Sequence, residues 1–175
     1  MKIVFTGPEC TGKTSIAQII GKRYNFCFIP EMAREYLDLR HNTYNEQSLY
    51  EIALLQLWAE KTGKENYHSL CCDTDILTIL IWQNEKYGYF DRDLMEKWSQ
   101  STVDLFFLCT PDFPWEYDSQ RENPEDRQRL FDIYFDILTH SNHPFHVLTG
   151  PLEQRILDVE RILTPLIFLA SDIDE

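Results

Sequence analysis

Residues 7–14 read Gly-Pro-Glu-Cys-Thr-Gly-Lys-Thr and match the phosphate-binding pattern G-x-x-x-x-G-K-[ST] at every fixed position. A short apolar run at 3–6 precedes this loop, and a segment with isoleucines at helical spacing, 15–24, follows it. Glycines let the backbone bend so that its N–H groups converge on a phosphate, and the new helix adds its positive end. A bare turn would explain the glycines but not the Lys-Thr pair after them, so we interpret the loop as a nucleotide site.

The loop also predicts roles for individual side chains. Lys13 is expected to reach the β- and γ-phosphates of ATP, where it would be catalytic, and the Thr14 hydroxyl is expected to bind Mg²⁺. The residues of the loop predicted to contact ATP are Gly7, Pro8, Glu9, Cys10, Thr11, Gly12, Lys13, Thr14 and Ser15.

Strands and helices are expected to alternate along the whole chain. Apolar runs predict five strands, at 3–6, 26–29, 69–73, 103–109 and 145–148, and amphipathic spacing predicts helices at 15–24, 46–61, 76–87, 93–100, 125–139 and 152–163. This alternation favours a three-layer α/β fold of the P-loop type, with a parallel sheet of about five strands covered on both faces. The length of 175 residues fits one domain, 1–175.

Composition narrows the class of partner. The net charge of −13 would repel nucleic acid and anionic membranes, so we expect a small-molecule substrate, with no nucleic-acid or membrane partner. The five cysteines lack C-x-x-C spacing, and the N-terminal MKIVFTG is not a secretory signal, so a cytoplasmic location is expected. The oligomeric state stays open.

Two acidic residues follow predicted strands. Asp73 ends the strand at 69–73, where a second acid that organises Mg²⁺ is found in this class, although aspartate is also common in turns. Glu31 directly follows the strand at 26–29 and is expected to begin a helix beside the acceptor, whose hydroxyl proton it would take. A structural alternative for Glu31 is stabilisation of the helix dipole. Both residues are predicted to be catalytic.

The segment at 111–127 is expected to be a lid. It contains three prolines and mixed charges and follows the fourth strand. Arg121 and Arg127 are expected to close over ATP, with Arg121 also catalytic, unless they are solvated surface charges. Because the GTPase motifs N-K-x-D and D-x-x-G do not occur in the sequence, a GTP switch is not expected.

Four stretches together resemble one family. IPEMAREYL (29–37), CDTD (72–75), PWEYDSQREN (114–123) and DRQRLF (126–131), with the phosphate-binding loop, resemble the ribosylnicotinamide kinase domain of NadR-type proteins, a branch of the AAA-like P-loop ATPases. The resemblance runs from Lys2 to about Arg161. It implies transfer of the γ-phosphate of ATP, with Mg²⁺, to nicotinamide riboside, giving nicotinamide mononucleotide in NAD salvage.

The resemblance also implies an acceptor site. Its predicted residues are Glu31, Arg34, Asp73, Asp75, Trp115 and Asp118. Acids would suit a cationic nucleoside, and Trp115 or Tyr36 could offer a π-face. Pro30 stands where some members have an aromatic residue, so the acceptor's base stays open.

Three other tryptophans, Trp58, Trp82 and Trp98, are predicted to lie in the core. Two alternatives to the kinase remain at this point: phosphorylation of another small metabolite or nucleoside, or a regulatory ATPase or ATP-binding module without an acceptor.

Overall fold

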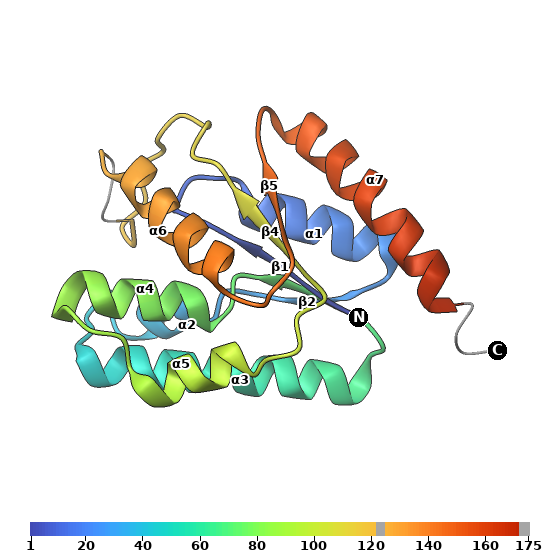
Figure 1. The fold of residues 1–175 in the computed structure, drawn as a ribbon. Helices are drawn as coiled ribbons and strands as arrows, with labels where there is room; N and C mark the ends of the chain where they lie inside the picture. The colour runs from blue at the N-terminus through green and yellow to red at the C-terminus, as the bar shows by residue number, and fades with distance from the viewer. Residues whose placement is uncertain (122–124, 172–175) are drawn as a thin grey trace.

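A computed structural model describes residues 1–121 and 125–171. Its centre is one five-stranded sheet made of β1 (Lys2–Thr6), β2 (Cys27–Ile29), β3 (Leu70–Asp73), β4 (Leu105–Cys109) and β5 (Phe145–Leu148). The strand order is β2-β3-β1-β4-β5, and every neighbouring pair is parallel (Figure 1). The carboxyl ends of all five strands therefore meet at one edge, where the loops can build a site.

Helices cover both faces of the sheet, as predicted. They are α1 (Lys13–Tyr24), α2 (Met32–Leu39), α3 (Glu46–Asn66), α4 (Ile76–Tyr87), α5 (Arg92–Ser99), α6 (Arg127–His140) and α7 (Leu152–Ser171). The pattern of burial shows which helices share a face: α1 and α7 pack with Ile3 and Phe5, whereas α2 to α6 pack with Val4. Alternate residues of β1 thus face two separate cores, which is the three-layer α/β arrangement.

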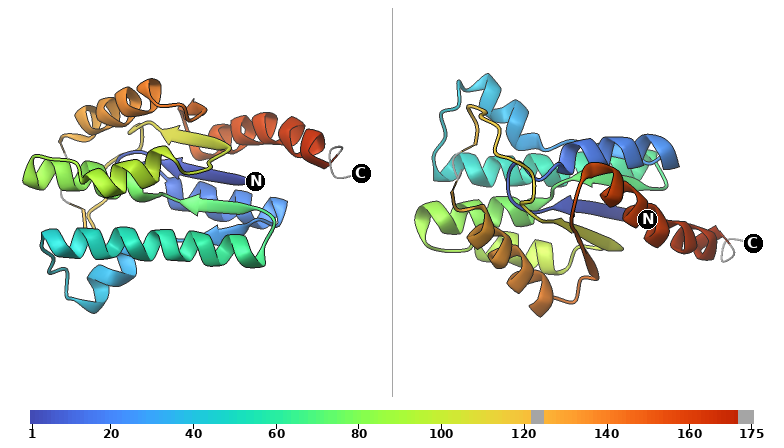
Figure 2. Two further views of the ribbon diagram at one scale, coloured as in Figure 1. Left: turned by 60° about the horizontal axis from the view of Figure 1, so that its bottom comes forward. Right: turned by 90° about the horizontal axis from the view of Figure 1, so that it is seen from above.

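The predicted element boundaries hold to within about two residues, with two exceptions: the helix expected at 46–61 continues to Asn66, and the last helix is longer than expected. The last helix was expected to end at Leu163, but α7 continues to Ser171 with Pro165 inside it. Val159, Leu163 and Ile167, four residues apart, face the core shared with α1, so the buried stripe runs past the proline. Figure 2 shows α7 running beyond the sheet.

One of the core predictions was wrong. Trp98 is buried, but Trp58 is 62% exposed. The buried face of α3 includes Gln56 and Glu60, and Trp58 is two residues from each, on the opposite side of the helix. Within residues 1–121 and 125–171, no helix has the length and apolar character needed to cross a membrane.

The segment after β4 passes over the carboxyl edge of the sheet and reaches α2 (Figure 2, right). Asn42 Nδ2 donates to Ser119 Oγ at 3.2 Å, which joins the loop after α2 to this segment. The lid predicted at 111–127 falls here, and its residues 122–124 lie outside the described part of the chain.

Candidate active site

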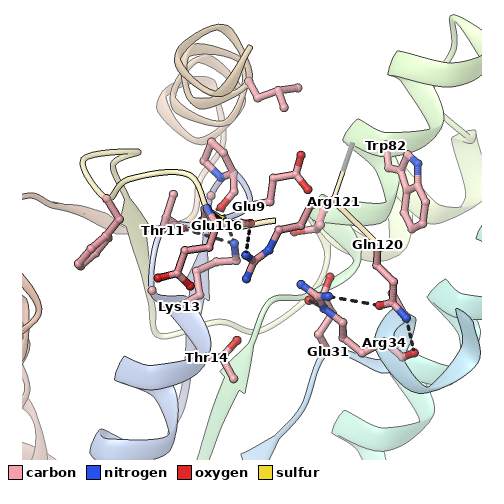
Figure 3. A pocket seen from close by; sticks show the side chains of 18 of the residues that line it. Glu9, Thr11, Lys13, Thr14, Glu31, Arg34, Trp82, Glu116, Gln120 and Arg121 are labelled. Atoms are coloured by element: carbon pink, nitrogen blue, oxygen red, sulfur yellow. Dashed lines mark hydrogen bonds and ion pairs between the residues drawn. The ribbon is translucent and has the colours of Figure 1, made fainter. Parts of the chain in front are cut away.

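A cavity of about 480 Å³ opens at the carboxyl edge of the sheet. In Figure 3 the phosphate-binding loop, with Thr11 and Lys13, lies on one side of it, and Trp82, Gln120, Glu31 and Arg34 lie on the other. The residues that line it are Gly7, Pro8, Glu9, Cys10, Thr11, Gly12, Lys13, Thr14, Ser15, Glu31, Ala33, Arg34, Leu37, Thr78, Ile81, Trp82, Glu85, Lys86, Phe113, Pro114, Glu116, Gln120, Arg121, Leu130, Tyr134 and Leu152.

The loop has the backbone that the pattern predicts. Gly7 has φ +126°, and a Cβ there would lie 2.7 Å from the carbonyl oxygen of Cys109, so the loop passes too close to β4 for a side chain. Gly12, at φ +77°, is the N-cap of α1, and the first turn of α1 carries no acidic residue. The positive end of α1 therefore faces the cavity without a carboxylate of its own first turn beside it.

Lys13 and Thr11 fix the shape of the loop from inside. Lys13 Nζ donates to Pro8 O at 2.6 Å, and Thr11 Oγ1 donates to the same carbonyl at 2.8 Å. The Lys13 ammonium is thus held at the concave side of the loop, next to the start of α1. This is the position in which a lysine can meet a polyphosphate.

Asp73, at the end of β3, is not among the residues that line the cavity and lies next to Thr14 at the start of α1. It is 3% exposed, it hydrogen-bonds with the Thr14 side chain, and its Oδ1 has no hydrogen-bond partner within residues 1–121 and 125–171. Burial, and then the nearby Glu31, raise its pKa to about 6, against the opposing effect of Lys13. An unpartnered buried carboxylate oxygen beside a threonine hydroxyl is a donor set that fits Mg²⁺. No group of three or more His, Cys, Asp and Glu suited to a metal occurs in the described part of the chain, so phosphate oxygens would have to complete such a site.

Asp75 does not belong to the cavity, contrary to its predicted place beside the acceptor. It is 2% exposed, and it caps α4 by accepting a hydrogen bond from Leu77 N at 3.1 Å. Its other oxygen accepts from Trp98 Nε1 at 3.1 Å. Burial raises the pKa of Asp75 to about 7, with Lys2 opposing this effect and Glu60 adding to it. Both oxygens of the Asp75 carboxylate therefore already accept hydrogen bonds from donors inside the protein.

Glu31 and Arg34, two of the residues predicted for the acceptor site, both line the cavity. Glu31 precedes α2, and its carboxylate lies 3.5 Å from Arg34 Nε. Arg34 Nη1 also donates to Asp118 Oδ2 at 2.7 Å and to Gln120 Oε1 at 3.3 Å. Asp118 is therefore not a lining residue but the link that ties Arg34 to the segment after β4. A hydrogen bond from the Gln120 backbone, together with Arg34, lowers the pKa of Asp118.

The two predicted lid arginines have different surroundings. Arg121 lines the cavity and donates from Nη1 to Glu116 O at 2.6 Å. Arg127 instead donates from Nη1 to Phe113 O at 2.9 Å and stands over the Trp115 ring at 5.8 Å. Arg127 Nη1 also donates to Cys10 O of the phosphate-binding loop at 3.4 Å, and neither Arg127 nor Trp115 lines the cavity.

The aromatic wall of the cavity is Trp82 and Tyr134, which sequence reasoning missed. Trp82 was assigned to the core from its helical context, yet it lines the cavity and donates from Nε1 to Tyr44 OH at 3.2 Å. Tyr36, proposed as a π-face, is 8% exposed, and its hydroxyl donates to Glu51. Only the register of α4 against the sheet decides that Trp82 faces the cavity.

A third unpredicted residue is Arg155 of α7, which is fully buried and donates to Thr11 O at 3.0 Å. No signal in the sequence pointed to Arg155, because its partner is a backbone carbonyl, which is the same at every position of a sequence.

The model of the AAA domain family matches residues 2–155, which is most of the chain. The chain belongs to the AAA domain family. The matched stretch contains the phosphate-binding loop, Glu31, Asp73 and the whole segment after β4. No curated protein matches the sequence of this family member.

Solved structures with a similar fold include a NadR protein, a thymidylate kinase and a deoxyadenosine kinase. A NadR protein in complex with NR superposes with a TM-score of 0.72 at 16% identity, over 92% of this chain and 48% of that one. Thymidylate kinase from Ehrlichia chaffeensis gives 0.68 at 18% identity, over 93% of this chain and 98% of that one. Deoxyadenosine kinase from M. mycoides gives a TM-score of 0.62 at 13% identity, over 94% of this chain and 100% of that one. This AAA domain chain spans about half of the NadR protein, and identities this low establish the shared fold alone.

Proposed function

We propose that this protein transfers the γ-phosphate of ATP to the ribose 5′-hydroxyl of nicotinamide riboside, giving nicotinamide mononucleotide and ADP. The observation that carries the proposal is that one cavity joins a complete phosphate-binding loop to a second wall with a carboxylate, Glu31, and an indole, Trp82. The structural likeness to a NadR protein in complex with NR agrees with it.

The donor half of the cavity would bind ATP through the loop and Lys13. Thr14 and Asp73 would hold Mg²⁺, which supplies charge neutralisation at the β- and γ-phosphates when bound. Arg121, which lines the same cavity, adds a positive charge where the transferring phosphoryl group would be. Arg127 would contribute by holding the backbone at Phe113 and not by touching the phosphates.

The acceptor half combines an aromatic face with charged groups. Arg34 is paired with Glu31 and Asp118. Lys86 also lines the cavity. Trp82 offers an aromatic face, and Glu85, also a lining residue, has its carboxylate paired with Arg129. A cationic pyridinium ring would be favoured by an indole face and by nearby carboxylates.

We assign Glu31 as the general base, which accepts the hydroxyl proton of the acceptor. The 5′-oxygen of the acceptor attacks the γ-phosphorus, the bond from that phosphorus to the ADP oxygen breaks, and the hydroxyl proton passes to the Glu31 carboxylate. Arg34, 3.5 Å away, would hold that carboxylate in place. Asp73 would stay ionised as a partner for the metal.

A panel of nucleosides with Mg-ATP tests the proposal. Protein, Mg-ATP and nicotinamide riboside are expected to give ADP and nicotinamide mononucleotide in equal amounts, and Mg-ATP alone little ADP. If another nucleoside has the higher kcat/KM, nicotinamide riboside is not the preferred acceptor, but the protein is still a nucleoside kinase. If ADP forms at the same rate without any acceptor, the protein is an ATPase and the proposed function is wrong.

A further inference from the structure

Arg155 is a fully buried cation whose partners come from three separate loops. Its Nε donates to Gly150 O at 2.7 Å, its Nη1 to Thr11 O at 3.0 Å and its Nη2 to Thr110 O at 3.0 Å. A guanidinium away from water must have its N–H groups satisfied, so these three carbonyls are held where the planar fork requires them. One side chain thus joins the phosphate-binding loop to the turns after β4 and β5.

Asp112 closes the same cluster from the other side. Its Oδ2 accepts from Thr110 Oγ1 at 2.6 Å, from Gly150 N at 2.7 Å and from Arg155 Nη2 at 3.1 Å. The Asp112 side chain is 43% exposed, whereas that of Arg155 is 0% exposed. This carboxylate is therefore the one formal countercharge in contact with the buried guanidinium among the described residues. We refer to Arg155, Asp112, Thr110 and Gly150 as the clasp.

The clasp also reaches Gly12, the N-cap of α1, through an aromatic ring. Arg155 Cζ stands 4.7 Å from the centre of the Phe113 ring. That ring in turn lies where a Cβ on Gly12 would come within 3.1 Å of it. Phe113, Gly12 and Leu152 all line the cavity on the side of the phosphate-binding loop. The clasp therefore underlies the donor half of the cavity and touches none of the residues assigned to the acceptor.

We propose that Arg155 and Asp112 are positioning residues for the donor nucleotide, which hold the phosphate-binding loop in its binding shape by fixing the carbonyl of Thr11. The Thr11 peptide lies in the stretch whose N–H groups must converge on phosphate. If its carbonyl is released, the neighbouring amides lose their fixed direction. The proposal rests on the proposed function only in requiring that the loop binds ATP.

Equilibrium binding of AMP-PNP with Mg²⁺, measured by calorimetry well below the unfolding temperature, tests this role. Asp112→Asn removes the countercharge at a half-exposed position, and Arg155→Lys keeps the charge but not the fork. Each is expected to raise the Kd for AMP-PNP about tenfold, the usual worth of a hydrogen bond to a charged group. In the double variant, the Kd for AMP-PNP is expected to rise by less than the product of the two single increases, because both substitutions act on one cluster.

The matched control is Arg161→Lys on the same helix, where an exposed arginine pairs with Asp158 at 2.7 Å. It is expected to leave the Kd unchanged. A lowered melting temperature with a Kd within twofold of the wild-type value in both clasp variants would mean that the clasp only stabilises the fold, and would overturn the proposal. The calorimetric titration contains no nucleoside, so its result does not depend on the acceptor. If the wild-type protein phosphorylates no nucleoside, the proposed function is wrong, but the role of the clasp in nucleotide binding is unaffected.

Discussion

At Gly7 the phosphate-binding loop passes close to β4, and replacing Gly7 with alanine is expected to destabilise the fold in two ways. The first is backbone strain at φ +126°, about 1 kcal/mol for an L-residue. The second is a clash, because the new Cβ would lie 2.7 Å from the backbone oxygen of Cys109, which cannot rotate away. Forcing backbone apart in a packed core adds about 2 kcal/mol. We expect Gly7→Ala to lose about 3 kcal/mol in total.

Gly88→Ala is the matched control, because Gly88 also has positive φ, +79°, but no described atom lies within 4 Å of the added Cβ. It is expected to cost only the strain, about 1 kcal/mol. Thermal unfolding should then show a drop of about 6–12 °C for Gly7→Ala and about 2–4 °C for Gly88→Ala. Equal drops would refute the close approach of the loop to β4, and unchanged AMP-PNP binding in Gly7→Ala would refute the role of that approach in shaping the loop.

Three further predictions concern the chemistry. Lys13→Ala is expected to lower kcat by roughly 10²-fold in the nucleoside kinase assay, because the charge matters most as the γ-phosphate departs, and normal turnover would contradict the nucleotide site. Glu31→Gln is expected to lose transfer while calorimetry still shows Mg-ATP binding, whereas Asp73→Asn is expected to raise the Mg²⁺ requirement; the reverse pattern would exchange the two roles. The raised pKa of Asp73, about 6, means that the folded protein takes up a proton before the unfolded chain does. As pH falls from 7 to 5, this residue should therefore stabilise the unliganded fold while Mg²⁺-dependent nucleotide binding weakens. Urea unfolding and calorimetry at both pH values check this, and a wild-type pH dependence in Asp73→Asn would show that another group titrates.

The nucleotide half of the site could be predicted from the sequence because its determinants are local. A phosphate-binding loop needs glycines at two fixed positions and a lysine at the start of the next helix, and the pattern at 7–14 contains all of them. The parallel sheet followed from the same kind of evidence, since alternating apolar runs and amphipathic stretches leave few other folds. The placement of Glu31 and Asp73 at the same edge of the sheet could also be predicted, because the carboxyl ends of parallel strands lie at one edge.

The acceptor half depended on side-chain directions that only packing decides. Asp75 is two residues from Asp73, yet it turns inward to cap α4 and to accept from Trp98, because a buried helix start and a buried indole both need an acceptor there. Trp82 and Trp58 lie in similar helical stretches, but the register of α4 turns Trp82 into the cavity and that of α3 leaves Trp58 outside.

The sequence alone thus determined the fold class, the phosphate-binding loop and the edge of the sheet at which chemistry would occur, since each is written in short-range spacing. Tertiary structure alone decided that Trp82 lines the cavity, that Asp118 pairs with Arg34 and that Arg155 donates to the phosphate-binding loop. Arg155 shows the reason most clearly. Its principal acceptors are backbone carbonyls of residues 11, 110 and 150, and a backbone carbonyl is the same at every position of the sequence.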